Sequence, residues 1–181
     1  MGKMFVFKGM NGFMPRLVDW SDKKIYHYDF KFNDNCVYNF EDEDKYDWNK
    51  LMGISYNFSH NRGNVLMVGW RYVNGLFELA PYEYKNGKRF THNPIFVVRV
   101  NEWFSCKIDK GEVTNVDGVL VSTPRFILLK DEVLDESDHG SAYYHTSFSG
   151  VNKDNKTREI YPWFGGTKSA PHYMSICRVK K

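Results

Sequence analysis

Apolar and polar residues alternate along most of the chain, which predicts β-strands joined by short polar turns. The acidic segments 41–50 and 131–140 interrupt the alternation and predict exposed loops holding at most one helical turn. Many short strands in close succession are typical of an antiparallel sandwich or barrel, so we expect one all-β domain over residues 1–181. The expected strands are 3–8, 25–32, 36–40, 52–58, 65–72, 76–84, 88–91, 95–104, a hairpin set within 106–121, 125–129, 142–148, 160–164 and 172–179.

Two Asn-Gly pairs, Asn74-Gly75 and Asn86-Gly87, lie between alternating segments and predict two tight hairpins. Both central residues of such a turn need a positive φ, which Asn and Gly adopt most easily. A two-residue turn also fixes the register of its strands. The predicted pairs are Val73 with Leu76, Tyr72 with Phe77, Arg71 with Glu78, Trp70 with Leu79, Gly69 with Ala80, Tyr84 with Arg89 and Tyr82 with Thr91.

The register divides the side chains of this meander between two faces, because successive side chains in a strand point to opposite sides. The expected core face carries Leu66, Val68, Trp70, Tyr72, Phe77 and Leu79. The opposite face carries Met67 and the candidate ligand-binding residues Arg71, Glu78, Tyr82, Tyr84, Arg89 and Arg99. In the next strand Val97, Arg99, Asn101 and Trp103 share one face, which adds Arg99 to this set. A bulge at Pro81 would turn Tyr82 and Tyr84 into the core, since proline in sheets favours edges and bulges.

Arginines beside tyrosines suit a carbohydrate or another anionic small ligand. Guanidinium groups bind carboxylate or phosphate through two hydrogen bonds, and aromatic rings stack on flat rings. The alternative is an ordinary solvated sheet face, because one face of an antiparallel sheet is normally wet.

Composition narrows the function classes. The 25 basic and 22 acidic residues give a net charge of +3, which argues against a double-stranded nucleic acid as partner. The three cysteines lack metal or redox spacing and suggest buried thiols in a reducing compartment. The chain has neither a signal-peptide pattern nor a transmembrane run, so we expect a soluble cytoplasmic or virion-associated protein without membrane contact.

Candidate metal and cofactor motifs are weak, and we expect no cofactor. The acidic run Glu41–Asp44 lacks the alternating ligand pattern of a calcium loop. The histidines His60, His139, His145 and His172 do not have zinc spacing, and the nucleotide-binding glycine motifs are missing from the sequence.

The end of the chain is distinctive. Residues Tyr161-Pro162-Trp163-Phe164-Gly165-Gly166 precede Ala170-Pro171-His172-Tyr173-Met174-Ser175-Ile176. Together with the Val68–Tyr72 and Tyr84–Gly87 segments, this pattern resembles concanavalin-A-like jelly rolls. The resemblance implies a two-sheet jelly-roll sandwich, the fold of many lectins, laminin-G-type modules and some polysaccharide lyases. The Gln-x-His motif of such lyases is missing from this chain.

Several functions stay open at this point. The first is a non-catalytic module that binds a carbohydrate or anionic small ligand. The second is a glycan lyase or hydrolase, with Tyr82 or Tyr84 as acid or base and Arg71 or Arg89 neutralising a carboxylate. The third is a virion structural protein whose aromatic face is a homo-oligomer interface, and a related one is an anti-defence protein that sequesters a nucleotide signal. The Asn-, Lys-, Tyr- and Phe-rich composition is similar to that of phage proteins.

Overall fold

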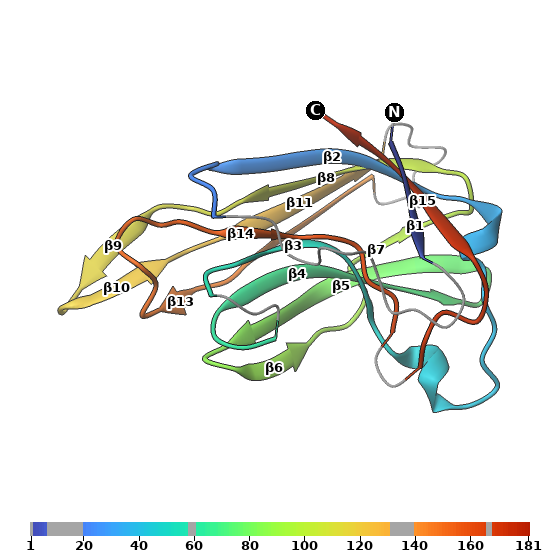
Figure 1. Ribbon diagram of the computed structural model, residues 1–181, viewed down its shortest axis with the longest axis horizontal. Helices are drawn as coiled ribbons and strands as arrows, with labels where there is room; N and C mark the ends of the chain where they lie inside the picture. The colour runs from blue at the N-terminus through green and yellow to red at the C-terminus, as the bar shows by residue number, and fades with distance from the viewer. Residues whose placement is uncertain (1, 7–19, 58–60, 131–139, 166–167) are drawn as a thin grey trace.

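The computed structural model describes residues 2–6, 20–57, 61–130, 140–165 and 168–181 as an antiparallel two-sheet β-sandwich (Figure 1). Sheet A has the order β1 (Gly2–Val6), β15 (Met174–Lys180), β2 (Ile25–Phe32), β8 (Trp103–Asp109), β11 (Arg125–Lys130) and β12 (Ser141–His145). Sheet B has the order β14 (Arg158–Ile160), β3 (Asn49–Ser55), β4 (Val65–Val73), β5 (Leu76–Lys85) and β6 (Lys88–Thr91), and β7 (Phe96–Val98) also pairs with β5. A small third sheet of β13 (Phe148–Ser149), β10 (Val119–Ser122) and β9 (Val113–Val116) extends to one side.

The main core lies between sheets A and B and is rich in aromatic rings. Phe32 of β2 stacks on Phe77 of β5, with ring centroids 4.3 Å apart, and lies 4.9 Å from the ring of Trp70. Such aromatic pairs add to the stabilisation that comes from burying their area. All six residues predicted for the core face of the meander belong to this core or pack against it. That prediction is confirmed.

The two Asn-Gly turns set the register of sheet B as predicted. Asn74 and Gly75 have φ values of 51° and 86°, and Asn86 and Gly87 have 50° and 81°. Every predicted cross-strand pair of the meander is present. Pairing runs without a shift through Pro81, which lies opposite Val68, so Tyr82 and Tyr84 stay on the face away from the main core.

The predicted strand 95–104 is wrong as a single element. The chain leaves sheet B after β7, turns through Asn101 with a φ of 63°, and enters sheet A as β8. The turn is held by the main-chain N–H of Arg99, which donates to a side-chain oxygen of Glu102 at 2.6 Å. β-branched residues before the turn and the aromatic residues Trp103 and Phe104 after it both favour strands, so the sequence pattern looks continuous.

Two further predictions near residue 40 need correction. Residues 36–40 are not a strand. Cys36 instead ends a short 3₁₀ helix, Asp34–Cys36. The acidic loop contains the expected single turn, a 3₁₀ helix over Glu43–Tyr46, but its last residue, Lys50, belongs to β3. The acidic loop 131–139, His60 and His139 lie outside the described residues.

The cysteines Cys36, Cys106 and Cys177 are free and buried, as predicted. Burial raises the pKa of Cys36 to about 12 and also raises that of Cys106. Within the described part of the chain, no helix is long and apolar enough to cross a membrane.

Candidate functional site: a groove on the outer face of sheet B

The face of sheet B that points away from sheet A carries both an apolar cluster and a polar groove. Trp48, Val65, Met67, Ala80, Tyr82 and Ile160 form the cluster. A groove of about 340 Å³ lies beside it. Its lining, here called the outer groove, consists of Tyr46, Asp47, Trp48, Lys50, Arg71, Tyr82, Arg89, Thr91, His92, Asn93 and Pro94.

Sheet register brings the groove residues together from four strands. Lys50 of β3 pairs with Gly69 of β4, which pairs with Ala80 of β5. The lysine therefore stands in one row with two small residues. In the next row Met67, Tyr82 and Thr91 are aligned across β4, β5 and β6. The absence of a side chain at Gly69 lets its neighbours approach closely, since a Cβ there would lie 3.3 Å from the Trp48 ring and 3.4 Å from Tyr82.

Lys50 is a buried lysine with its ammonium group at the groove. Its Nζ donates to the main-chain oxygens of Trp48 at 2.9 Å and Gly165 at 3.2 Å. The same nitrogen lies 4.6 Å from the centre of the Tyr82 ring. Burial is the main cause that lowers the pKa of Lys50 to about 8; the charge of Asp47 opposes this shift and the charge of Arg89 adds to it.

Tyr82 lies next to Lys50 and is 4% exposed. Its ring packs 5.9 Å from that of Tyr84. Burial is the main cause that raises the pKa of Tyr82 above its usual value, and Tyr84 adds to it. The hydroxyl therefore stays protonated over the pH range in which Lys50 loses its proton.

The two arginines of the groove differ in their partners. Nε of Arg71 donates to Glu78 at 2.7 Å, and its guanidinium lies 4.3 Å from the Trp48 ring. Nη1 of Arg71 also donates to the main-chain oxygen of Tyr46. Among the described residues, no carboxylate lies within ion-pair distance of Arg89, whose pKa is raised chiefly by Tyr82. Arg89 is thus the arginine with capacity for an added anion.

One wall of the groove is fixed from the other sheet. His92 Nε2 lies 3.1 Å from the hydroxyl of Tyr144 on β12, which also donates to Glu83 at 3.1 Å. Glu83 lies between Tyr82 and Tyr84 on β5 but faces the interior and is 1% exposed. The segment after β6 is therefore tied to sheet A.

Five of the six sequence-predicted residues share this face. Arg71, Tyr82 and Arg89 line the groove, while Glu78 holds Arg71 and Tyr84 packs on Tyr82. The sixth, Arg99, is an exposed residue after β7 and does not line the groove, because the predicted strand ends before it.

Sequence reasoning missed Lys50, Trp48 and His92. Lys50 stands at the end of an acidic run, and that run suggested an exposed loop. A signal was present: Lys50 directly precedes the apolar segment Leu51–Ile54, which predicts that it belongs to a strand and not to a loop. The β-bulge between Lys50 and Met52 then shifts the register, which alternation alone does not predict.

The groove combines a weakly basic amine, a protonated phenol and guanidinium groups in a partly buried space. Such a set can bind an anion, accept one proton and donate another. Among the described residues, no cluster of three metal-ligating side chains is present.

Comparisons with known proteins bear on the fold. The search of protein-family models found no match, and the search of curated proteins found none either. Among solved structures, the chain is similar to a marine PL-14 alginate lyase from Aplysia kurodai, with a TM-score of 0.54 and 15% sequence identity. The match covers 98% of this chain and 80% of the lyase. This likeness agrees with the predicted all-β jelly-roll fold.

Proposed function

We propose that the outer groove binds an acidic polysaccharide and cleaves it by β-elimination. The observation that carries the proposal is the buried amine of Lys50, with a pKa of about 8, placed 4.6 Å from the Tyr82 ring in a groove that also holds Arg71 and Arg89. The structural likeness to an alginate lyase supports an acidic polysaccharide as the ligand class.

Binding rests on charge and aromatic contact. Arg89 would pair with the carboxylate of a uronic acid, because its guanidinium has no carboxylate partner among the described residues. Tyr46 lines the same groove, is half exposed and offers a ring face for a sugar. Arg71, already paired with Glu78, adds positive potential and keeps the Trp48 ring in place.

The reaction needs one base and one acid. Neutral Lys50 would remove the proton on the sugar carbon next to the carboxylate, C5, and Arg89 would stabilise the charge that moves onto that carboxylate. The electron pair then forms the C4=C5 double bond as the C4–O4 bond breaks. Tyr82 would protonate the leaving oxygen, so one proton is taken up, one is given, and no oxidant is required.

The geometry around Nζ suits this role. A neutral amine has two hydrogens, and the oxygens of Trp48 and Gly165 accept two. The lone pair then faces neither oxygen, and the Tyr82 ring and the groove lie beside the same nitrogen.

Binding without catalysis is the second candidate. With a pKa of about 8, most Lys50 side chains are charged at pH 7, and a charged lysine would serve as a further anchor for a carboxylate. In that case the chain would be a lectin-like module for the same ligands.

The test uses purified protein with polymannuronate, polyguluronate, polyglucuronate and polygalacturonate. Elimination creates a double bond conjugated to the carboxylate, which appears as new ultraviolet absorbance, while calorimetry on the same samples reports binding. The proposal expects absorbance with the wild type and none with Lys50→Met, whose binding persists. Binding by the wild type without product would favour the second candidate. Neither binding nor product with any of the four polymers would overturn both.

A further inference from the structure

A second cavity, of about 540 Å³, opens on the outer face of sheet A, away from the outer groove. Its lining, here called the Arg125 cavity, consists of Lys24, Asp109, Gly111, Glu112, Thr114, Thr123, Arg125, Tyr143 and His145. Asp109, Arg125 and His145 stand in one row across β8, β11 and β12, and so share a face of the sheet. The proposed elimination uses none of these residues.

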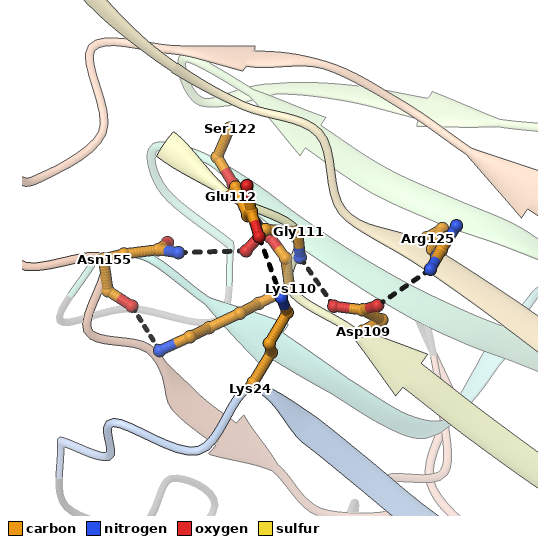
Figure 2. A network of polar contacts seen from close by, with 8 residues as sticks. All are labelled: Lys24, Asp109, Lys110, Gly111, Glu112, Ser122, Arg125 and Asn155. Atoms are coloured by element: carbon orange, nitrogen blue, oxygen red, sulfur yellow. Dashed lines mark hydrogen bonds and ion pairs between the residues drawn. The ribbon is translucent and has the colours of Figure 1, made fainter. Parts of the chain in front are cut away.

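The floor of this cavity is rigid. The carboxylate of Asp109 accepts the main-chain N–H of Gly111 at 2.9 Å and Nη2 of Arg125 at 3.1 Å (Figure 2). Gly111 has a φ of +71°, and a Cβ there would lie 2.5 Å from the main-chain oxygen of Thr123. Only glycine fits this turn, and the turn fixes the carboxylate that positions Arg125.

An exposed aromatic side chain stands beside this fixed arginine. Tyr143 is 53% exposed, and its ring lies 5.7 Å from the ring of His145 on the same face of β12. A hydrogen bond to Tyr143, followed by the one to Asp109, raises the pKa of Arg125. An exposed ring next to oriented donors offers both a stacking face and hydrogen-bond partners to one ligand.

The charges of the Arg125 cavity cancel. Lys24 pairs with Glu112 at 3.0 Å and Arg125 pairs with Asp109, so two cations face two carboxylates. The outer groove differs, because Lys50 and Arg89 line it with Asp47 as the one carboxylate among the lining residues. A balanced cavity offers donors and acceptors together, which favours a neutral ligand rich in hydroxyl groups over an anion.

We propose that the Arg125 cavity is a second carbohydrate site, which binds a neutral sugar chain. One sugar ring would stack on Tyr143, and its hydroxyls would hydrogen-bond to Arg125 and to the hydroxyls of Thr114 and Thr123. The site is independent of the proposed elimination in the outer groove.

The test is calorimetric titration of the full chain with neutral hexasaccharides of β-linked glucose, mannose, galactose and xylose. We expect at least one of them to bind, and Tyr143→Ala to weaken that binding by about ten-fold or more. Tyr173→Ala is the matched control, because Tyr173 is also exposed, at 41%, but does not line this cavity. The affinity of Tyr173→Ala for the neutral hexasaccharide should equal that of the wild type.

A second variant and a second ligand keep the result interpretable. Arg125→Gln should also weaken binding, with thermal unfolding confirming that the variant is folded. Lys50→Met should bind the neutral hexasaccharide like the wild type, so loss of the elimination and loss of this site are separate results. Failure of all four sugars to bind, or binding that Tyr143→Ala leaves unchanged, would overturn the proposal. Binding of polyuronate in place of neutral sugar at Tyr143 would overturn it as well.

Discussion

Lys50 and Lys110 are both buried lysines whose Nζ donates to two main-chain oxygens, yet their surroundings differ. Lys50 bonds Trp48 and Gly165 and faces the Tyr82 ring at the outer groove. Nζ of Lys110 donates to the main-chain oxygen of Asn155 at 2.6 Å (Figure 2) and to that of Asp22 at 3.1 Å. It thereby ties two loops to the end of β8. Burial lowers the pKa of both.

The comparison shows that a lowered lysine pKa does not identify a catalytic group. The groups that lie near Nζ, besides its two main-chain acceptors, decide what the lysine can do. Lys50 shares a groove with the phenol of Tyr82 and two arginines. Lys110 lies between Asp109 and Gly111 in the turn after β8 and does not line that groove. We therefore propose a chemical role for Lys50 and a structural one for Lys110.

The sharpest test of this difference is Lys50→Met. We expect product formation on an acidic polysaccharide to fall by about 100- to 10,000-fold, the range that general acid–base groups contribute. Methionine keeps the length and apolar stem of the side chain but cannot accept the proton. Ultraviolet absorbance measures the rate, and thermal unfolding serves as the control for folding. A variant that retains most of the rate would remove Lys50 from the mechanism.

The converse variant is Lys110→Met. It leaves the oxygens of Asp22 and Asn155 without their buried donor, so we expect a loss of about 1–3 kcal/mol of unfolding free energy. The elimination rate per folded molecule should not change. Urea unfolding and the absorbance assay measure the two quantities. If the elimination rate fell by a similar factor in Lys50→Met and Lys110→Met, the proposed difference in role between the two lysines would be wrong.

The arginines sharpen the comparison further. Arg89→Ala should raise KM for an acidic polysaccharide by about ten-fold, because one charged hydrogen bond to the carboxylate is lost. Arg125→Ala, on the outer face of sheet A, is the control and should leave KM unchanged. Steady-state kinetics distinguish the two, and equal effects would mean that binding depends on overall charge.

The smallest expected effect is that of pH. The pKa of Lys50 is lowered to about 8, so its neutral form increases as the pH rises through that value. Between pH 7 and pH 9 we expect kcat to rise about ten-fold and then level off, while Tyr82 stays protonated. A flat profile, or a fall over this range, would exclude neutral Lys50 as the base.

Short-range signals explain why much of the fold was predictable. The turns Asn74-Gly75 and Asn86-Gly87 fix strand direction and register within a few residues, and five candidate residues followed from that register. The Arg99 prediction failed because β-branched and aromatic residues favour strands on both sides of the point where the chain changes sheets. The position of Lys50 depends on a bulge and on contacts with Trp163 and Gly165, more than a hundred residues along the chain. Alternation within a segment contains no information about such partners.

Chemical labelling of the buried thiols would measure how often the folded protein opens. Cys36, Cys106 and Cys177 are enclosed, and thiol reagents attack the thiolate form, which burial suppresses at Cys36 and Cys106. Cys106 on β8 and Cys177 on β15 flank β2 in the middle of sheet A. Cys106 belongs to the core between the sheets, whereas Cys177 pairs with Lys31 and lies outside that core. The labelling rate of Cys106 would therefore follow opening of the core, while the outer groove, on sheet B, stays free of any label.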